Sequence, residues 1–476
     1  MTTTWEPVIG LEIHVQLKTR TKMFCRCPVA FGAGENTLTC PVCLGFPGAL
    51  PVINRQAIES TIKLGLALGC EIAPHAVFAR KNYFYPDLPK GYQISQYDLP
   101  SCISGKMLVP LQDGEHTVSI VRAHLEEDAA KNVHVGGSTG RIGGASATLV
   151  DYNRGGTPLV EIVTGPDIRS ADEAKTFLQL LRQTIVELGI SDAEMEKGTM
   201  RVDANVSVRP VGSDELRTRC EIKNMNSFTF IARGIEAEVA RQIAVWESGG
   251  AVLQETYDYD AAHNRLTARR SKEEADDYRY FPDPDLVPVE PAPELVDRLG
   301  AEIPVAPADR IHEIRGTLGH ERAVVLVTGG LDALWRATVE AGADSTAAAN
   351  VIANAVVAAG HDPAEVSPAE LAALVGARER IPRQVFDEAI AKLAEPGFTA
   401  APYLAQEAMS DTSALEPIIA AILDANPGQV AAFRGGKEGL LGFFVGQVMK
   451  ETQGKADARV VSDLLKARLA SHPDRG

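Results

Sequence analysis

Residues 8–17 read VIGLEIHVQL, and from Ile9 onward apolar side chains alternate with polar or small ones. Alternation with a period of two is typical of a β-strand that packs one face on a core. Glu12 and His14 then share the opposite face, roughly 6.5–7 Å apart along the strand, a span that one cation can bridge. The predicted core residues of this strand are Ile9, Leu11, Ile13, Val15 and Leu17.

Four later segments have the same design, with carboxylates on the polar face of an expected strand. The polar side chains are Arg122, His124 and Glu126 in IVRAHLEED, Glu161 in PLVEIV, Arg201, Asp203, Asn205 and Ser207 in RVDANVSVR, and Arg219, Glu221 and Lys223 in RCEIK. The apolar side chains between them include Val121, Ala123 and Leu125 in the first segment and Val202, Ala204, Val206 and Val208 in the third. An unpaired carboxylate such as Glu161 would be costly to bury in an apolar strand.

Polar strand faces usually meet water. Five strands that combine carboxylates with histidine, asparagine or lysine instead favour a Mg²⁺ or Mn²⁺ site, because these cations prefer oxygen ligands. The spacing therefore predicts a metal-dependent site on an antiparallel sheet, and by itself it names no reaction.

Four of the seven cysteines form two short hooks, CRC and CPVC, within the first tenth of the chain. Four thiolates at this spacing predict a closed tetrahedral Zn²⁺ site that pins the loop between the first strand and a helix starting near Arg55. The alternative is four reduced thiols that only pack together. The predicted zinc ligands are Cys25, Cys27, Cys40 and Cys43, whereas Cys70, Cys102 and Cys220 are expected to be small buried residues.

The bulk composition narrows the class of protein. A formal net charge of −16 argues against a protein that coats nucleic acid non-specifically, but it leaves room for a local basic groove. The opening MTTTWEP lacks the basic end and apolar core of a signal peptide. No stretch approaches the ~20 apolar residues of a membrane span. We therefore expect a cytoplasmic protein without membrane contact.

Two proline-containing breaks divide the chain. The segment PDPDLVPVEPAPE at 282–294 contains five prolines and ends regular structure, and a second break falls at AEPGFTAAPY, residues 394–403. Strand and helix patterns mix before the first break, whereas Ala-rich helical spacing follows it. The prediction is an α+β chain with an antiparallel-sheet domain at 1–293, an all-α helical domain at 294–405 and a small α-helical tail domain at 406–476.

Several long segments together resemble one family closely. They are IGLEIHVQL, CPVCLGFPGALPVIN, RKNYFYPDLPKGYQISQYD, RAHLEEDAAK, LVDYNRGGTPLVEIVTGPDIRS, RVDANVSVR, EIKNMNSF, DDYRYFPDPDL and GKEGLLGFFVGQVMK. In this order they resemble the B subunits of the three-subunit aspartyl/glutamyl-tRNA(Asn/Gln) amidotransferases, the GatB/GatE family. The resemblance covers essentially the whole chain.

The resemblance implies a function, cofactors and partners. Proteins of this kind use ATP and Mg²⁺ to phosphorylate the side-chain carboxylate of a mischarged Glu-tRNA(Gln) or Asp-tRNA(Asn), and ammonia then displaces the phosphate. An A subunit supplies ammonia from glutamine, and a small C subunit completes the heterotrimer. The resemblance leaves open which of the two tRNAs is the substrate. It also implies that the first domain is the catalytic cradle and that the tail binds tRNA.

The resemblance assigns roles to the polar strand residues. It implies a Mg²⁺ site formed by Glu12, His14, Glu126 and Glu161. We predict catalytic roles for Glu126, Glu161 and Lys223, and contacts to ATP or its metal for Lys81, Arg154, Asp203 and Glu221. The predicted tRNA contacts are Tyr83, Tyr85, Lys437, Lys450 and Lys455, although tyrosines often only pack and exposed lysines are usually only solvated.

The chain contains neither the Walker pattern GxxxxGK(S/T) nor a usable dinucleotide fingerprint. Its Gly-rich stretch VGGSTGRIGGAS, residues 135–146, lies between two of the matched segments, where relatives are often shorter. We interpret this stretch as a surface hairpin rather than a phosphate-binding loop.

Two other functions remain as alternatives. A stand-alone Mg²⁺-dependent carboxylate–amine ligase would have no need of the long helical tail. A non-catalytic, zinc-stiffened RNA-binding module would be repelled by carboxylate-bearing strands unless a cation lay between them and the RNA.

Overall fold

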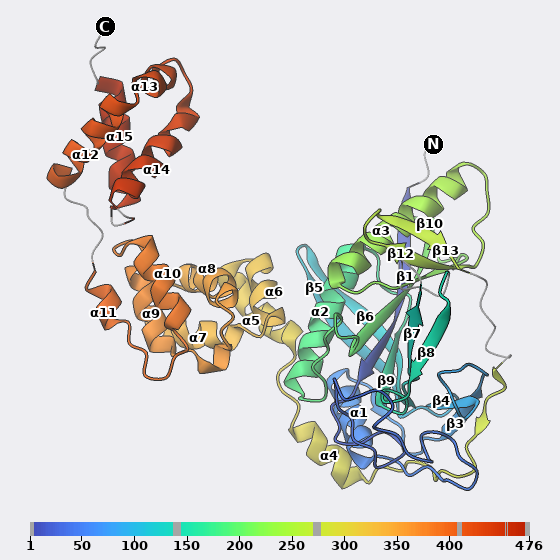
Figure 1. Ribbon diagram of the computed structural model, residues 1–476. Helices are drawn as coiled ribbons and strands as arrows, with labels where there is room; N and C mark the ends of the chain where they lie inside the picture. The colour runs from blue at the N-terminus through green and yellow to red at the C-terminus, as the bar shows by residue number, and fades with distance from the viewer. Residues whose placement is uncertain are drawn as a thin grey trace. The chain divides into compact units, whose positions relative to one another are not determined.

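The computed structural model describes residues 4–136, 144–269, 278–406, 412–452, 454 and 456–471. The chain divides into two compact units, Met1–His312 and Glu313–Gly476. The first combines sheets with helices and the second is helical, so the predicted α+β class is confirmed (Figure 1). The division at residue 312 falls within helix α5 (Pro307–Leu318), later than the break predicted near 293.

A nine-stranded sheet dominates the described part of the first unit, in the order β13-β12-β11-β10-β1-β9-β6-β5-β2. Neighbours pair antiparallel except β11 and β12, which are parallel. The antiparallel prediction therefore holds for all but this pair. The strands are β1 (Trp5–Gln16), β2 (Glu71–Ile72), β5 (Cys102–Leu111), β6 (Gly114–Glu127), β9 (Pro158–Thr164), β10 (Met200–Pro210), β11 (Cys220–Lys223), β12 (Thr256–Asp260) and β13 (Arg265–Ala268).

The alternation in the sequence sets which face of the central strands is buried. Along β1, Ile9, Leu11, Ile13 and Val15 are fully buried, whereas Glu12 and His14 are only partly so. The inward residues Val202, Ala204, Val206 and Val208 of β10 are buried too. On β6 one expectation was wrong. Val121 does not share the core face of Ala123 and Leu125, because a β-bulge between Ile120 and Arg122 leaves it 49% exposed.

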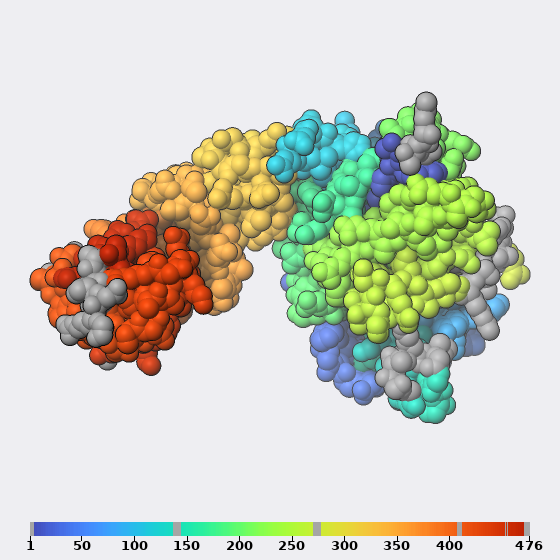
Figure 2. All heavy atoms as spheres, turned by 90° about the horizontal axis from the view of Figure 1, so that it is seen from above, coloured from blue at the N-terminus to red at the C-terminus, as the bar shows by residue number. Residues whose placement is uncertain are grey.

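Three helices are built on this sheet, and each begins at a side-chain cap. Asn54 caps α1 (Arg55–Ala67), Ser170 caps α2 (Ala171–Glu187) and Ser227 caps α3 (Phe228–Glu247), each accepting hydrogen bonds from backbone N–H groups of the first turn. Helix α3 packs against α2 and β10, and α2 packs against β5. In the space-filling view, α3 and the strands that follow it form the yellow-green surface of this unit (Figure 2).

Two small sheets complete the first unit. β3 (Phe78–Asn82) pairs with both β4 (Tyr92–Gln96) and β14 (Phe281–Pro282), and β4 packs on β6. β7 (Lys131–Val135) and β8 (Ala147–Asp151) form an antiparallel hairpin. The pairing of these two strands agrees with the interpretation of the Gly-rich stretch as a surface hairpin, and residues 137–143 of that stretch lie outside the described part of the chain.

Beyond α4 (Pro293–Ala301) the described elements are helical. They are α5, α6 (His320–Thr328), α7 (Asp332–Glu340), α8 (Ser345–Val351), a π-helical stretch (Ile352–Val356), α9 (Pro368–Ala377), α10 (Arg383–Lys392), α11 (Ala401–Leu404), α12 (Thr412–Ala425), α13 (Pro427–Arg434), α14 (Leu441–Glu451) and α15 (Ala458–Ser471), with short 3₁₀ helices at Pro363–Glu365 and Glu438–Leu440. The last four pack around a core of their own, which includes Leu415, Phe444, Val448 and Leu465. Among the described helices, none has the length and apolar character that crossing a bilayer requires.

Candidate active site

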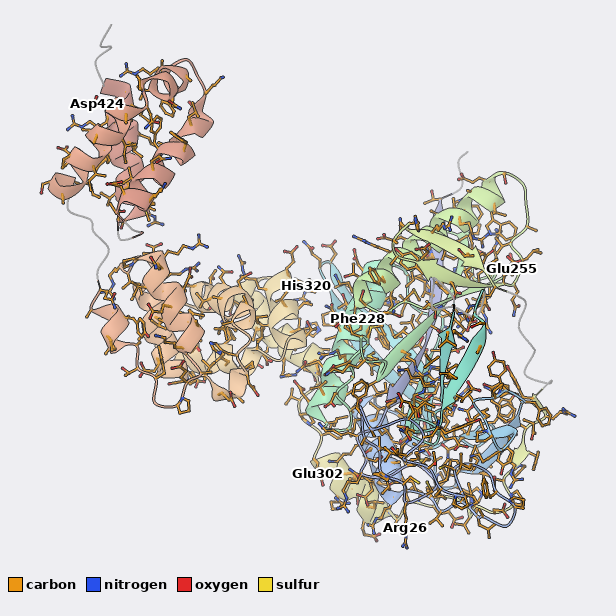
Figure 3. All side chains as sticks on the ribbon, viewed as in Figure 1. Arg26, Phe228, Glu255, Glu302, His320 and Asp424 are labelled. Carbon is orange, nitrogen blue, oxygen red and sulfur yellow. The ribbon has the colours of Figure 1, made fainter. Side chains whose placement is uncertain are left out.

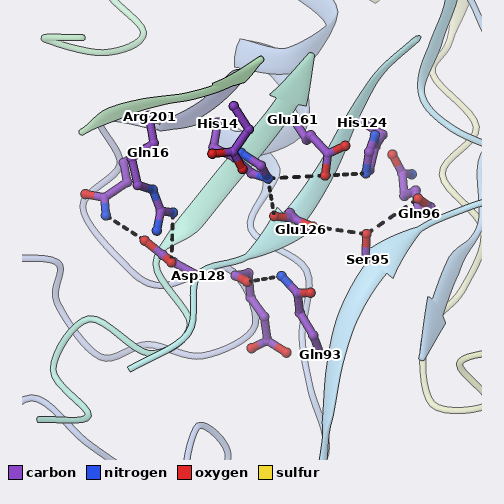
Figure 4. Close-up of polar contacts among 12 residues, drawn as sticks. His14, Gln16, Gln93, Ser95, Gln96, His124, Glu126, Asp128, Glu161 and Arg201 are labelled. Atoms are coloured by element: carbon purple, nitrogen blue, oxygen red, sulfur yellow. Dashed lines mark hydrogen bonds and ion pairs between the residues drawn. The ribbon is translucent and has the colours of Figure 1, made fainter. Parts of the chain in front are cut away.

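His14, Glu126 and Glu161 meet on the polar face of the large sheet, and we call them the first carboxylate group. The strand register explains why. His14 on β1 lies opposite Glu161 on β9, while Glu126 lies on β6, the next strand along. The Nε2 atom of His14 is 3.3 Å from Oε2 of Glu161 and 3.8 Å from Oε1 of Glu126 (Figure 4). One ligand atom from each residue lies within 4.8 Å of the others, which fits the spacing around one cation.

His124 extends this row by one strand. His124 is on β6, opposite Glu161 of β9, and its Nε2 atom is 3.6 Å from Oε2 of Glu161 (Figure 4). His124 is 3% exposed, and its Nδ1 atom has no hydrogen-bond partner among the described residues. The sequence placed His124 on the polar face but indicated no role for it. Its burial, which sets it apart, depends on the neighbouring strands.

Ser95 on β4 contacts the buried carboxylate of Glu126, its neighbour Gln96 contacts the backbone just before Glu126, and sequence reasoning missed both. The Ser95 hydroxyl donates to Oε2 of Glu126 at 3.3 Å. Oε1 of Gln96 accepts from the backbone N–H of Leu125 at 3.1 Å and from Ser101. These contacts join the small sheet to β6 (Figure 4). No local pattern in YQISQ distinguishes its polar residues from ordinary surface ones.

Burial and mutual charge set the protonation of the first group. Burial alone would lower the pKa of His14, but its hydrogen bond to Glu161 and the charge of Glu126 raise it to about 9. Burial, followed by the charge of Glu161, raises the pKa of Glu126 to about 7. The pKa of Glu161 is held below its usual range, because the adjacent histidines outweigh the effect of burial. A divalent cation binding here must therefore displace protons, as is usual for such ligands.

Glu12, Asp203 and Glu221 form a second carboxylate group, again with ligand atoms within 4.8 Å of one another. The prediction had placed Glu12 with His14, Glu126 and Glu161, and the structure separates them. The reason is again the register. Glu12 lies opposite Asp203 on β10, on the side of β1 away from β9, and Asn205 lies opposite Glu221 on β11.

Lys223 lies between the carboxylates of the second group. Its ammonium pairs with Asp203 and lies 3.2 Å from Oε1 of Glu221. Asn205 donates to Oε1 of Glu12 at 3.3 Å. Burial would lower the pKa of Lys223, but Asp203 and Glu221 together raise it. The predicted residues Asp203, Glu221 and Lys223 are thus brought together. They lie on β10 and β11, whereas Glu161 and Glu126 of the first group lie on β9 and β6, on the other side of β1.

The two other predicted cations lie in different surroundings. The ammonium of Lys81 on β3 is 4.7 Å from the centre of the Tyr278 ring, a cation–π contact. Arg154 donates to the backbone carbonyls of Ala129 and Ala130 at 2.9 and 2.8 Å. Its guanidinium also lies 3.8 Å from Asp128. Arg154 therefore stabilises the loop that follows β6.

Tyrosines line the small sheet beside the first group. Tyr83 stacks on Tyr85 at 6.5 Å between ring centres and meets Tyr278 edge-on. Tyr97 stacks on Tyr280 at 4.2 Å. Tyr278 and Tyr280 carried no prediction, although two tyrosines within DDYRYF were a visible signal. In the tail, Lys437 and Lys450 are exposed, and Lys455 lies outside the described residues.

The four predicted zinc ligands meet in the loop between β1 and α1. One Sγ atom from each of Cys25, Cys27, Cys40 and Cys43 lies within 4.8 Å of the others, which fits a tetrahedral thiolate site. Arg26, labelled in Figure 3, belongs to this loop. The Cys25 thiol and the nearby Lys22 ammonium lower the pKa of Cys43 to about 4. Cys70, Cys102 and Cys220 are buried elsewhere, as expected.

Both units of the chain match domains of known proteins. Residues 7–297 match the GatB/GatE catalytic domain, and residues 334–469 match the GatB domain. The chain is 47% identical to the B subunit of the aspartyl/glutamyl-tRNA(Asn/Gln) amidotransferase from Anaeromyxobacter sp. (strain K), over 98% of this chain and 99% of that protein. Identity is 48% to the protein of the same name from Geobacter sulfurreducens and 44% to that from Syntrophotalea carbinolica, with the same coverage.

Proposed function

Because this chain belongs to the GatB/GatE family of amidotransferase B subunits, we propose that it activates and amidates the side-chain carboxylate of a mischarged tRNA. The substrate is Glu-tRNA(Gln), Asp-tRNA(Asn) or both. The observation that carries the proposal is the first carboxylate group, a partly buried set of oxygen and imidazole ligands on the sheet of the domain that matches the GatB/GatE catalytic domain.

The chemistry explains why such a site is needed. A carboxylate is a poor acceptor for ammonia, because its leaving group would be oxide. In the proposed reaction a substrate carboxylate oxygen attacks the γ-phosphorus of ATP, the bond to the bridging oxygen breaks, and ADP leaves with its electron pair. Ammonia then attacks the acyl carbon, phosphate leaves with the C–O electron pair, and the nitrogen loses a proton to solvent.

Each of the two groups would bind one cation. His14, Glu126 and Glu161 would hold Mg²⁺, and Glu12, Asp203 and Glu221 would hold a second cation in exchange for the Lys223 ammonium. Bound Mg²⁺ would screen the charges of the phosphates. Ser95 holds the Glu126 carboxylate in place, and Lys81 offers a cation for phosphate. The stacked tyrosines Tyr83 and Tyr85 offer aromatic faces for a base.

The other parts of the chain would bind tRNA, the partner subunits and zinc. We propose three modules with boundaries near 293 and 405: the catalytic cradle, a helical domain and a tail whose exposed Lys437 and Lys450 contact tRNA phosphates. A glutaminase A subunit and a C subunit would complete a heterotrimer, since the relatives are named as B subunits. The four cysteines would hold structural Zn²⁺. A substrate that serves translation implies a cytosolic location. The full-length family match favours neither a tRNA-independent ligase nor a non-catalytic binding module.

The decisive experiment measures ADP formation by the chain co-purified with its A and C subunits, with Mg²⁺ and ammonium. We expect ADP only when Glu-tRNA(Gln) or Asp-tRNA(Asn) is present, together with the amidated product. Equal turnover without tRNA would support a small-substrate ligase instead. Retained tRNA binding without turnover on either mischarged tRNA would support a binding module.

Titration with Mn²⁺, followed by electron paramagnetic resonance, is expected to resolve two classes of bound cation. Glu161→Gln should weaken one class at least 10- to 100-fold. Asp203→Asn should weaken the other to a similar extent, because the two groups share no ligand residue. Glu115→Gln, the same acid-to-amide change at a half-exposed position of β6, should alter neither. Loss of the same class in both site variants would indicate one shared site.

A further inference from the structure

The side chain of Arg122 on β6 has no hydrogen bond or ion pair to any described residue. Its Nε atom is buried. By contrast, Lys223 pairs with Asp203, and Arg201 pairs with Asp128 at 3.0 Å. A buried guanidinium nitrogen without an acceptor is costly, so the missing acceptor calls for an explanation.

The backbone around Arg122 departs from regular strand geometry on both sides. The β-bulge at Val121 shifts the register just before Arg122. On the paired strand β5, Ser104 lies across from this bulge, between the partners of Arg122 and Ile120, and has a φ of +56°. A positive φ is unfavourable for a serine, and bulges commonly redirect a side chain beside an active site. The distortion thus coincides with the unpaired cation.

The register places Arg122 between the two carboxylate groups. Arg122 lies opposite Val163 on β9, and Val163 lies opposite Glu12 of the second group on β1. Along β6, Arg122 precedes His124 and Glu126 on the same face. The Val163 side chain is apolar and accepts no hydrogen bond. Val163 is therefore flanked in the sheet by Arg122 on β6 and Glu12 on β1, and Glu161 of the first group lies two residues before it on β9.

A transferring phosphoryl group is suited to a position between this guanidinium and these carboxylates with their bound cations. Its charge is spread over three equatorial oxygens, and a guanidinium offers two parallel N–H donors that match two of them. We propose that Arg122 donates two hydrogen bonds to the γ-phosphoryl group while it passes from ATP to the substrate carboxylate. This assignment rests on the proposed function and adds a substrate-binding residue to it. An acceptor supplied by the substrate accounts for the absence of a protein acceptor.

The test compares Arg122→Gln and Arg122→Lys in the purified heterotrimer. We expect Arg122→Gln to lower kcat for tRNA-dependent ADP formation on the order of 10²-fold, as for loss of one preorganised donor. The KM for mischarged tRNA and the affinity for Mn²⁺ should change less than about threefold, because Arg122 contacts neither in this proposal. Arg122→Lys keeps the charge but loses the paired donors, so it should recover only part of kcat. Arg209→Gln, which removes an arginine paired with Glu6 on the same sheet, should keep wild-type kcat.

A second measurement guards against a folding defect. ADP with aluminium fluoride, a mimic of the transferring phosphoryl group, should raise the melting temperature of the wild-type complex but not of Arg122→Gln. Full activity of Arg122→Lys, or loss of Mn²⁺ binding in Arg122→Gln, would show that Arg122 is only a counter-charge and would overturn the assignment. Absence of tRNA-dependent ADP in the wild type would instead refute the proposed function and this assignment with it.

Discussion

Replacing Glu126 with glutamine is expected to lower tRNA-dependent ADP formation by the heterotrimer at least ~10²-fold. Glutamine keeps the shape of the side chain and can still contact the Ser95 hydroxyl. It loses the negative charge with which Glu126 would bind Mg²⁺, and Lewis-acid stabilisation by a cation is worth several kcal/mol. Each 1.36 kcal/mol corresponds to about a factor of ten in rate, so the expected loss is large. Steady-state ADP release on Glu-tRNA(Gln) measures it.

The control for this variant is Glu115→Gln on the same strand, whose side chain is 52% exposed and pairs with His312. It should keep wild-type turnover, because an exposed ion pair contributes only about 0–1 kcal/mol. Ser95→Ala should have an intermediate effect, since it removes one hydrogen bond to Glu126 and keeps its charge. Wild-type turnover by Glu126→Gln would exclude Glu126 as a metal ligand.

The faces of the strands could be predicted from the sequence, but their partners could not. Alternation within VIGLEIHVQL is a local property, so the placement of Glu12 and His14 on one face was correct. Which carboxylate each one meets depends on strands that lie far along the chain. Asp203 and Glu161 pair with opposite edges of β1, and a shift of register by one residue would turn every side chain over. The four residues predicted to form one site therefore lie in two groups, with His14, Glu126 and Glu161 in the first and Glu12 in the second.

The bulge in β6 shows a second limit of sequence reasoning. In IVRAHLEED the alternation is regular, and nothing in it indicates that Val121 is an extra residue. The bulge exists because β5 and β9 pair with β6 on both sides. The same holds for Ser95, which meets Glu126 only because β4 packs on β6. The cysteines could be predicted because their short hooks bring the thiols together within one loop.

Removal of one thiol from the cysteine loop is expected to cause the largest loss of stability. Cys43→Ala should abolish stoichiometric zinc in the purified chain and lower the melting temperature of the N-terminal unit by roughly 10 °C. The reason is that structural zinc contributes folding free energy directly, on the order of 10 kcal/mol in small zinc peptides. Even a third of that value exceeds the roughly 1 kcal/mol of a typical substitution. Metal analysis and a thermal scan measure both quantities.

Cys70→Ala separates loss of zinc from loss of a buried thiol. Cys70 is buried, with its N–H bonded to Gly65 of α1 and its sulfur beside Gly105 of β5, and it lies outside the group of four, so its removal should leave the zinc content at one per chain. A chelator should lower the melting temperature of the wild type and of Cys70→Ala, but leave Cys43→Ala unchanged. If the wild type contained no zinc and Cys43→Ala melted like Cys70→Ala, the four cysteines would be reduced thiols that only pack. The loop between β1 and α1 would then depend on contacts such as the hydrogen bonds from Asn54 to Thr21 for its conformation.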